Sequence, residues 1–428
     1  MEFSYSSDYC VHLPASKSIG ARYLVASFFA GTLPTCREFD DCDDLKVIQK
    51  ALNIVFLNEN EKDTEVGRVD VGASGTAFRF MAAVIASTPG ADFILTGTDR
   101  LVSRPMIPLL DVLRAAGAYV ESLGGENKGP YRIKGSKLKG GKFEIRGDIS
   151  SQFISALMLV APTWRNGMML RFTTPLVSRP YIEMTAKIME RFGIEVDFRE
   201  DRVIVNHGDY VAPEHFEVEA DWTAASYFFA AKCFSSDWTS IAGLVPPEAS
   251  LQGDSAVVDF FLRMGVGCCF KKDEGAVVVR VADAYDYVEI DLKDNPDLMP
   301  ALAIGSLMQG TRFKFTGVRN LRIKESDRLL AMKTEIEKLG YPIVVGEDSI
   351  EWRGGAWSMP ECVINTYDDH RIAMAFAIMA RLNSNIRIAN PEVVNKSFPG
   401  FWDQLPVIGL ECRREGDVMH VVRKDWLI

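Results

Sequence analysis

Residues 13–22 read Leu-Pro-Ala-Ser-Lys-Ser-Ile-Gly-Ala-Arg, and a mostly apolar run follows over 23–31. This stretch predicts the start of a buried helix, because Pro14 ends an extended segment and the serines can cap free N–H groups. Lys17 and Arg22 place two cations where the helix dipole is already positive, which disfavours the isolated helix. An anion bound at this helix start would reverse that cost. An exposed polar helix start is the alternative interpretation.

The composition limits the class of protein. The chain has 428 residues, 47% of them hydrophobic and 25% charged, which is typical of a soluble protein with two domains. Its net charge of −10 disfavours broad nucleic-acid binding, so a positive site has to be local, and small anions remain candidate substrates. The sequence shows neither a signal peptide nor an apolar stretch of about 20 residues, so a cytoplasmic protein without a membrane partner is expected.

Cysteine and histidine patterns predict neither disulfides nor a metal site. The eight cysteines form no Cys-x-x-Cys pair and no disulfide framework, which favours reduced packing residues. The five histidines are scattered along the chain, which disfavours a zinc site.

The opening pattern of a small polar or acidic turn followed by an apolar helix recurs along the chain. The copies are spaced by roughly 60 to 75 residues, longer than a common solenoid repeat. Chance recurrence is the alternative, since small apolar helices are common in buried cores. The six predicted helices begin near Ser16, Ser74, Ser150, Asp221, Asp297 and Asp369.

A strand, a second helix and two further strands follow in each copy. The loops before the second helices resemble one another, with Ser-Arg-Pro at 103–105 and again at 178–180. The second helices end near glycine, and extended segments follow. The repeated unit is therefore predicted to be βαβαββ. Later strands are expected at 118–121, 194–198, 202–205 and 341–345.

Six copies divide most simply into two domains of three. A crossover near residues 218–221 predicts one domain over 15–220 and a second over 221–428, and segment 1–14 is assigned to the second domain. Alternating strands and helices indicate an α/β or α+β fold, while the order of strand pairing is not determined by composition and spacing.

Cations gather at the predicted helix starts and at the loops before the second helices. Helix N-termini that point into one cleft would attract anions within an acidic protein. A single arginine in a turn is more often a solvated or salt-bridged surface group. Seven cations at equivalent places favour anion binding: Lys17, Arg22, Arg104, Lys324, Arg328, Arg371 and Lys396.

Two further helix starts offer neutral groups to a ligand. Gly75 followed by Thr76 allows close approach of the backbone, but residues 72–76 lack the Gly-Lys-Ser/Thr ending of a P-loop, so no ATP site is predicted. The Ser-Ser-Gln sequence at 150–152 offers two hydroxyls and an amide, suited to a phosphate or to sugar-like hydroxyls. Plain helix capping is the alternative there.

Two carboxylates are candidates for acid–base chemistry. Asp297 opens a helix after Asn-Pro, and Glu325 lies between Lys324 and Arg328. A helix cap and a salt-bridged surface group are the corresponding structural alternatives. Nearby cations would hold both carboxylates ionised, whereas burial would raise their pKa values, and the sequence leaves the balance open.

Taken together, the motifs resemble the 5-enolpyruvylshikimate-3-phosphate synthase family over essentially the whole chain. They are Leu-Pro-x-Ser-Lys-Ser with Arg22, Ser-Gly-Thr-Ala with Arg79, Ser-Arg-Pro, Ser-Ser-Gln, Lys-Glu-Ser-Asp-Arg, Asp-His-Arg, and Lys396 before Ser-Phe-Pro. The resemblance implies two similar domains of three βαβαββ units each, an inside-out α/β barrel with the active site in the cleft between the domains. It implies transfer of the enolpyruvyl group of phosphoenolpyruvate to the 5-hydroxyl of shikimate 3-phosphate, with release of phosphate.

The resemblance also implies which residues bind the two substrates, with no metal or organic cofactor. For shikimate 3-phosphate they are Lys17, Ser18, Arg22, Ser150, Ser151, Gln152, Ser178, Tyr181, Asp297, Asn320 and Lys324. For phosphoenolpyruvate they are Lys17, Gly75, Arg104, Gln152, Arg328, Arg371 and Lys396.

The implied addition and elimination steps need an acid and a base. Our hypothesis is that Asp297 accepts the hydroxyl proton, Glu325 exchanges the proton at the methylene carbon, and Lys17 neutralises the departing phosphate. No nucleic-acid or membrane partner is implied, and a monomer is expected.

The sequence departs from the common family pattern on one helix. Ala73 and Phe80 stand where many relatives carry asparagine and proline, although Gly75 is kept. The related UDP-N-acetylglucosamine enolpyruvyl transferases share fold and donor but use a loop cysteine, and this chain has no cysteine between Cys42 and Cys233. The remaining alternatives are a non-catalytic anion-binding scaffold and a relative that binds nucleic-acid ends, and Asp297, Glu325 and the acidic net charge disfavour both.

Overall fold

A computed structural model describes residues 10–32, 42–60, 66–234, 238–271, 275–356, 362–382 and 386–424. The chain folds as two units, each with its own core. Unit 1 comprises Met1–Ser16 and Glu219–Ile428, and unit 2 comprises Lys17–Val218. The boundaries predicted from the sequence lie two residues away, at 14–15 and 220–221.

Unit 2 contains two four-stranded sheets with the same topology. In each sheet the first two strands pair in parallel and the other two are antiparallel, and the chain order is strand, helix, strand, helix, strand, strand. This is the predicted βαβαββ unit. The strands are β2 (Gly67–Asp70), β3 (Asp92–Thr96), β5 (Tyr131–Lys134) and β4 (Tyr119–Ser122) in one sheet, and β6 (Gly141–Ile145), β7 (Met168–Phe172), β9 (Arg202–Val205) and β8 (Val196–Phe198) in the other.

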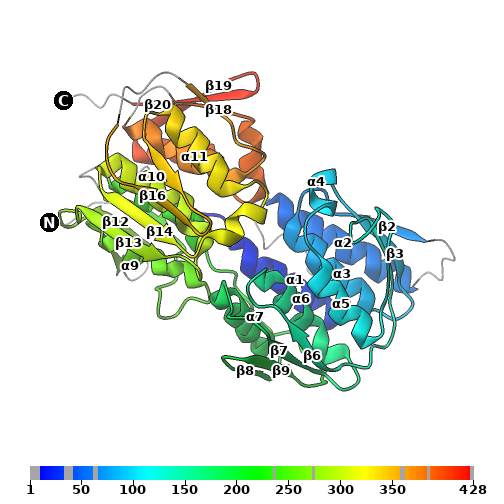
Figure 1. The fold of residues 1–428 in the computed structure, drawn as a ribbon. Coiled ribbons are helices and arrows are strands. Elements are labelled where there is room, and N and C mark those ends of the chain that lie inside the picture. Colours follow the sequence, from blue (N-terminus) through cyan, green and yellow to red (C-terminus); the bar gives the residue numbers. More distant parts are fainter. Residues whose placement is uncertain are drawn as a thin grey trace. The chain divides into compact units, whose positions relative to one another are not determined.

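Three buried helices form the centre of unit 2. Helices α1 (Lys17–Phe29), α3 (Gly75–Ser87) and α6 (Ser151–Val160) contact one another, and most of their residues are buried. Helices that are apolar all round fit a core position. In Figure 1 the strands lie outside these helices. The remaining helices are α2 (Asp43–Asn60), α4 (Asp99–Val102), α5 (Ile107–Ala116), α7 (Arg179–Arg191) and the 3₁₀ helix η3 (Ala161–Thr163).

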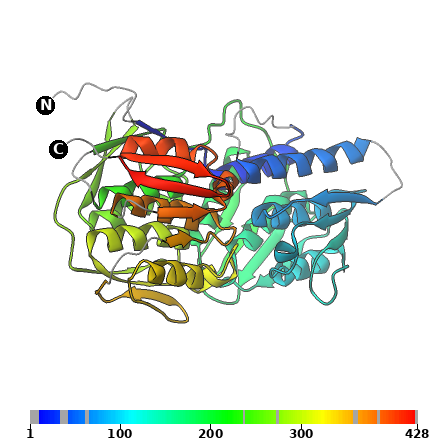
Figure 2. The same cartoon turned by 90° about the horizontal axis from the view of Figure 1, so that it is seen from above.

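Unit 1 contains three sheets of the same topology. Its first sheet begins with β1, the N-terminal strand, which pairs in parallel with β10. Figure 2 shows the C-terminal strands, in red, on the outside of this unit. The sheets are β1 (Cys10–His12), β10 (Trp238–Ala242), β12 (Gly275–Arg280), β11 (Val266–Lys271); β13 (Tyr287–Asp291), β14 (Arg312–Thr316), β16 (Ser349–Trp352), β15 (Ile343–Val345); and β17 (Cys362–Ile364), β18 (Ile386–Ala389), β20 (Val418–Arg423), β19 (Leu410–Glu415).

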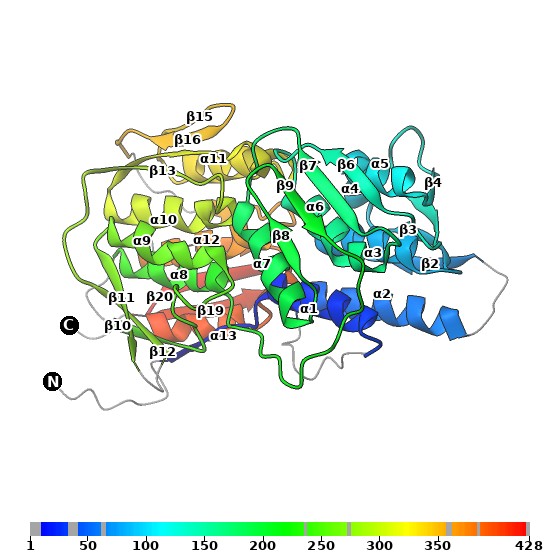
Figure 3. The same cartoon turned by 90° about the horizontal axis from the view of Figure 1, so that it is seen from below.

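Unit 1 also has three mutually contacting central helices. They are α8 (Trp222–Lys232), α10 (Met299–Gln309) and α12 (His370–Ile378), which Figure 3 shows side by side. Every residue of α8 and α12 is buried. The remaining helices are α9 (Val257–Leu262), α11 (Arg328–Lys338), α13 (Phe401–Gln404) and the 3₁₀ helices η4 (Gly253–Ala256), η5 (Pro296–Leu298), η6 (Arg319–Ile323), η7 (Met379–Arg381), η8 (Pro391–Lys396) and η9 (Leu405–Ile408).

Five sheets are therefore seen in the described residues, and they confirm the mixed α/β fold class. The sixth predicted copy contains α1 and α2, and its segments 33–41 and 61–65 lie outside the described residues. Within the described ranges, no helix combines the length and apolar composition needed to span a bilayer.

Most of the predicted helix starts are confirmed by their caps. Ser74, Ser150, Asp221 and Asp369 each accept a backbone N–H bond at the start of α3, α6, α8 and α12. Of the two serines expected to cap α1, Ser16 does not, because its buried hydroxyl has no hydrogen-bond partner among the described residues, and Ser18 lies within the helix.

Candidate active site

The starts of the three central helices of unit 2 meet through side chains. Gln152 Nε2 donates a hydrogen bond to Thr76 Oγ1 (3.0 Å), which joins α6 to α3. Arg22 Nη2 donates to Ser155 Oγ (3.1 Å), which joins α1 to α6. The positive ends of three helix dipoles therefore lie together, as an anion site requires.

Gly75 faces two guanidinium groups. A Cβ at this position would lie 2.6 Å from Arg104 Nη1 and 2.8 Å from Arg79 Nη1. Burial lowers the pKa of Arg79 well below its ordinary value, and the charge of Arg104 lowers it further. Arg79 Nε has no hydrogen-bond partner among the described residues. Two like charges held together beside a glycine form a place where an anion would relieve repulsion.

Arg22 lies inside unit 2, with 2% of its surface exposed. Its guanidinium donates to Thr185 Oγ1 (2.7 Å), to the Ser18 carbonyl (2.8 Å) and to the Tyr181 carbonyl (3.1 Å). Burial lowers its pKa to about 10. In this structure Arg22 holds α1 against α6 and α7, and its predicted contact with a substrate stays a prediction.

Phe80, one of the departures from the family pattern, packs beneath Arg22. The phenylalanine is buried, and Arg22 Cζ lies 5.6 Å from the centre of its ring. This distance is within the range of a cation–π contact. The large residue at position 80 therefore supports a cation of the predicted site.

Lys17 pairs with an acid, Asp44, that no sequence pattern singled out. Its Nζ lies 2.9 Å from Oδ2 of Asp44, which is in the first turn of α2. The carboxylate offsets the unfavourable position of a cation at a helix start.

The other predicted residues of unit 2 lie at the starts of α6 and α7. Ser150 caps α6 by accepting the Gln152 N–H (3.3 Å), and Ser151 begins that helix. Ser178 precedes α7 with φ 55°, a left-handed conformation that is uncommon for serine, and makes no cap bond. Tyr181 is in the first turn of α7.

In unit 1 the centre of the site is Asp297. Its carboxylate lies 2.9 Å from Arg328 Nη1, 2.9 Å from Arg371 Nη2 and 3.5 Å from Lys324 Nζ. Burial raises the pKa of Asp297, but the three cations outweigh burial and hold that pKa well below its ordinary value. Asp297 lies in the turn η5 before α10 and does not cap that helix.

Arg328 is surrounded by carboxylates. With 1% of its side chain exposed, it donates from Nε to Asp369 (2.8 Å), from Nη1 to Asp297 (2.9 Å) and from Nη2 to Glu325 (2.9 Å). Burial lowers its pKa, and these three acids raise it by more, so the net shift is upward. One guanidinium thus fixes both of the carboxylates predicted to act in catalysis.

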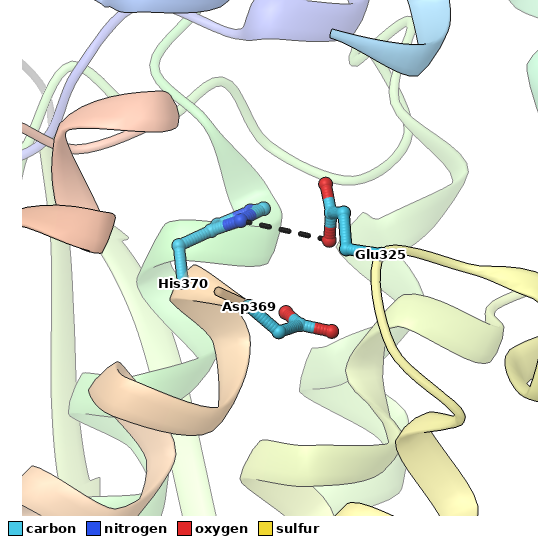
Figure 4. Close-up of side chains that lie close together, drawn as sticks. All are labelled: Glu325, Asp369 and His370. Carbon is cyan, nitrogen blue, oxygen red and sulfur yellow. Dashed lines mark ion pairs between the residues drawn. The ribbon is translucent and has the colours of Figure 1, made fainter. Parts of the chain in front are cut away.

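Glu325 lies close to the start of α12 (Figure 4). His370 Nδ1 is 3.7 Å from Glu325 Oε2, and the two residues form with Asp369 a group whose ligand atoms lie within 4.8 Å of one another. Such a group has the residue types of a metal site. Arg328 already binds both of its carboxylates, so positive charge is supplied by the protein at that place.

The remaining predicted residues of unit 1 lie on neighbouring turns. Asn320 is in η6, and its buried Oδ1 has no hydrogen-bond partner among the described residues. Lys396 ends η8, and its Nζ donates to the Asp368 carbonyl (2.7 Å). The buried Oδ1 of Asn320 can therefore accept a hydrogen bond from a hydroxyl of a ligand.

The sequence predictions missed several residues that contact the predicted site residues: Arg79, Thr76 and Asp44 in unit 2, and Asp369 and His370 in unit 1. Arg79 stood in a quoted motif without an assigned role, and its spacing of four from Gly75 on a helix was an available signal. Asp44 and Thr76 gave no such signal, because their partners are distant in sequence. Asp369 and His370 adjoin Arg371 in a quoted motif, and neither was assigned a role.

Both units thus present helix starts and cations that suit small anions; unit 2 adds hydroxyls, and unit 1 adds two carboxylates on one guanidinium. This combination defines an anion-binding α/β enzyme of repeated units. The family model "EPSP synthase (3-phosphoshikimate 1-carboxyvinyltransferase)" matches residues 8–405. The chain belongs to this family.

Individual relatives agree. The 3-phosphoshikimate 1-carboxyvinyltransferase of Bacteroides fragilis (strain YCH46) is 38% identical over 402 residues, covering 93% of this chain and 95% of the relative. That of Hamiltonella defensa is 35% identical over 413 residues, covering 92% and 95%. The fold matches an EPSP synthase structure from Acinetobacter baumannii with a TM-score of 0.71 at 20% identity, covering 97% of each chain.

Family membership confirms the enzyme class expected from the sequence. The chain is a transferase of the shikimate pathway, and its activity is enolpyruvyl transfer from phosphoenolpyruvate to shikimate 3-phosphate.

Proposed function

We propose that this transfer proceeds by addition and elimination with Asp297, Glu325 and Lys17 as the reacting protein groups. Glu325 gives a proton to the methylene carbon of phosphoenolpyruvate, and the 5-hydroxyl of shikimate 3-phosphate attacks the adjacent carbon while Asp297 accepts its proton. The bond from that carbon to the phosphate oxygen then breaks while Asp297 returns its proton to that oxygen, phosphate leaves next to Lys17, and Glu325 takes a methyl proton back to restore the double bond.

One observation carries this assignment. Asp297 and Glu325 both lie 2.9 Å from the same guanidinium, that of Arg328. The two carboxylates are therefore held a short distance apart on a buried cation, so that one acid and one base can face a single reacting carbon and its attacking hydroxyl.

The depressed pKa of Asp297 bears on its role as a base. A carboxylate held ionised by three cations is a weak proton acceptor. Both substrates are anions, and we infer that phosphoenolpyruvate draws Arg371, and shikimate 3-phosphate draws Lys324, away from Asp297. The pKa of Asp297 then rises toward that of an effective base when the substrates are bound.

The cation pair beside Gly75 supports the proposed phosphoenolpyruvate site of unit 2. Arg104 and Arg79 converge there without a side chain at position 75 between them. A carboxylate or phosphate would bind both guanidinium groups. We assign Lys17, Arg104 and Gln152 of unit 2, together with Arg328, Arg371 and Lys396 of unit 1, to phosphoenolpyruvate.

Hydroxyls and amides support the proposed shikimate 3-phosphate site. Asn320 Oδ1, which has no hydrogen-bond partner in the part of the chain that the structure describes, suits a hydroxyl of the ring, and the start of α6 suits a phosphate. The proposed ligands are Lys17, Ser18, Arg22, Ser150, Ser151, Gln152, Ser178, Tyr181, Asp297, Asn320 and Lys324.

A phosphate-release assay tests the acceptor. Phosphoenolpyruvate is supplied with shikimate 3-phosphate, with UDP-N-acetylglucosamine, or alone. We expect release only with shikimate 3-phosphate. Release with the nucleotide sugar would identify the alternative transferase, and binding of phosphoenolpyruvate without release from either acceptor would favour a scaffold.

We also propose that the enzyme works as a cytoplasmic monomer and has no nucleic-acid partner. The net charge of −10 supports the last point, because nucleic acids repel an acidic surface. Light scattering on the eluted protein tests the monomer, and a mass near 95 kDa, about twice 47.6 kDa, would show a dimer instead.

A further inference from the structure

The turn before α12 has a strained backbone. Tyr367 has φ 54° and Asp368 has φ 55°, so two consecutive residues other than glycine adopt the left-handed conformation. This conformation brings the Cβ too close to the following carbonyl oxygen, and it persists only where the surroundings hold it. The turn ends at Asp369, which caps α12 by accepting the Arg371 N–H (3.0 Å). The direction of Arg371 therefore depends on this turn.

Helix α11 holds the turn at two points. Arg328 and Glu335 lie seven residues apart on α11 and so share one face of that helix. Arg328 binds the carboxylate of Asp369, at the end of the turn. Glu335, which is fully buried, accepts the Tyr367 hydroxyl (2.6 Å) and the Asn365 N–H (3.1 Å), at the start of the turn.

The hydrogen bond between Tyr367 and Glu335 is stabilised by its surroundings. Lys338 Nζ lies 2.6 Å from Glu335 Oε2 and offsets the charge of the buried carboxylate. Burial raises the pKa of Tyr367 to about 12, and the nearby Glu335 raises it as well. The hydroxyl is therefore protonated at neutral pH and donates to the carboxylate, which is a strong type of hydrogen bond.

The same turn also anchors Lys396. The Lys396 Nζ donates to the Asp368 carbonyl (2.7 Å), and Asn390 Nδ2 donates to Asp368 Oδ1 (2.9 Å). A change in the left-handed conformation would rotate this carbonyl. Arg371 and Lys396, both assigned above to phosphoenolpyruvate, thus depend on one small segment of backbone.

We propose that Glu335 is a positioning residue for enolpyruvyl transfer, which acts through Tyr367 by fixing the left-handed turn that directs Arg371 and anchors Lys396. Glu335 does not contact the substrates in this proposal. The proposal rests on the function proposed above, because that function assigns the two cations to phosphoenolpyruvate.

The Tyr367→Phe variant tests the proposal with a matched control. The change removes one hydroxyl from a side chain that is 40% exposed, so the fold should tolerate it. Tyr287→Phe is the control, because Tyr287 is 41% exposed and also donates to a glutamate, Glu289 (3.3 Å), on a strand of the same unit. Glu335→Gln keeps the size of the side chain and one acceptor oxygen. It should therefore raise KM for phosphoenolpyruvate by less than Tyr367→Phe does.

We expect Tyr367→Phe to raise KM for phosphoenolpyruvate about tenfold, with KM for shikimate 3-phosphate and the melting temperature nearly unchanged. The control should match the wild type. A purely structural role for the bond would instead lower the melting temperature and leave both KM values alike. That result, or wild-type kinetics in Tyr367→Phe, would overturn the proposal.

Hydrogen exchange separates this proposal from the proposed function. Amides 366–371 should exchange faster in Tyr367→Phe than in the wild type or in Tyr287→Phe, whatever reaction the enzyme catalyses. Unchanged exchange there would show that the bond does not hold the turn. Faster exchange in Tyr367→Phe, together with a wild-type protein that releases no phosphate, would support the role of the Tyr367–Glu335 bond in holding the turn and reject the proposed function.

Discussion

Arg328 donates to three carboxylates at once, and two of these, Asp297 and Glu325, are the proposed base and acid. Arg328 follows Glu325 by only three residues, so that pair was predictable from closeness along the chain, although Glu325 lies before α11 begins. The contact with Asp297 spans 31 residues and could not be foreseen. The balance left open at the sequence level is decided at Asp297, where cations outweigh burial.

At the residue scale we expect Asp297→Asn and Glu325→Gln each to lower kcat by at least about 100-fold, a far larger effect than the change in substrate dissociation constants. Each change keeps the shape of the side chain but removes its ability to exchange a proton at neutral pH. Steady-state kinetics and ligand titration measure the two quantities separately. Glu289→Gln, at an exposed glutamate paired with Lys314, is the control and should keep full activity. Near-normal turnover in either site variant would remove that residue from the mechanism.

The depressed pKa of Asp297 also predicts a pH dependence of stability. A carboxyl with a lower pKa in the folded than in the unfolded chain stabilises the fold above its unfolded pKa, near 4, and loses that contribution as the pH falls toward the folded value. Asp297→Asn leaves three cations facing an uncharged amide, so its melting temperature should lie below that of the wild type at pH 7. The gap should narrow as the pH falls below about 4. A gap that is constant over pH 7 to 3 would contradict the ion cluster as its cause.

At the element scale, both units bring helix starts together, and glycine is essential at one of them. A methyl group at Gly75 would need Arg79 and Arg104 to move, because its carbon would lie within 3 Å of both guanidinium groups. The caps at Ser74 and Asp369 followed from local sequence, since a serine or aspartate before an apolar run is a strong helix signal. The absence of a cap at Ser16 could not be predicted from local sequence, because the backbone N–H of Ser16 bonds the carbonyl of Glu219, which is distant in sequence (2.8 Å).

We therefore expect Gly75→Ala to raise KM for phosphoenolpyruvate by about tenfold or more while KM for shikimate 3-phosphate changes little. The displaced guanidinium groups would bind the anion in a poorer geometry. Initial rates with each substrate varied in turn provide the measurement. Gly208→Ala serves as the control, because a Cβ there meets only Ile194 at an ordinary 3.7 Å. Equal effects on both substrates would argue against an anion site at Gly75.

At the scale of the whole molecule, the repeats were predictable and the pairing within them was not. Recurring helix signals and glycine-terminated second helices gave the βαβαββ unit, and strands β4, β8, β9 and β15 begin within two residues of the expected segments. In each sheet the fourth strand in sequence lies between the second and the third, which forms the edge. This order depends on long-range pairing that spacing does not encode. For the same reason, the role of β1 was only assignable to a domain, not to a partner strand.

The proposed ligands of each substrate come from both units, which predicts a change on binding. Adding both substrates should lower the radius of gyration in small-angle scattering, because each anion would bind cations of both units. Shikimate 3-phosphate with an unreactive analogue of phosphoenolpyruvate would keep the complex from turning over during the measurement. An unchanged radius with saturating ligands would count against closure.

The pairing of β1 with β10 also has a consequence for synthesis of the chain. Residues 10–12 are synthesised before Lys17–Val218, whereas their partner Trp238–Ala242 is made only after that whole unit. Unit 2 is continuous in sequence and can therefore fold while unit 1 still lacks most of its length. Strand β1 can pair only after β10 has been synthesised, so unit 1 is completed after unit 2.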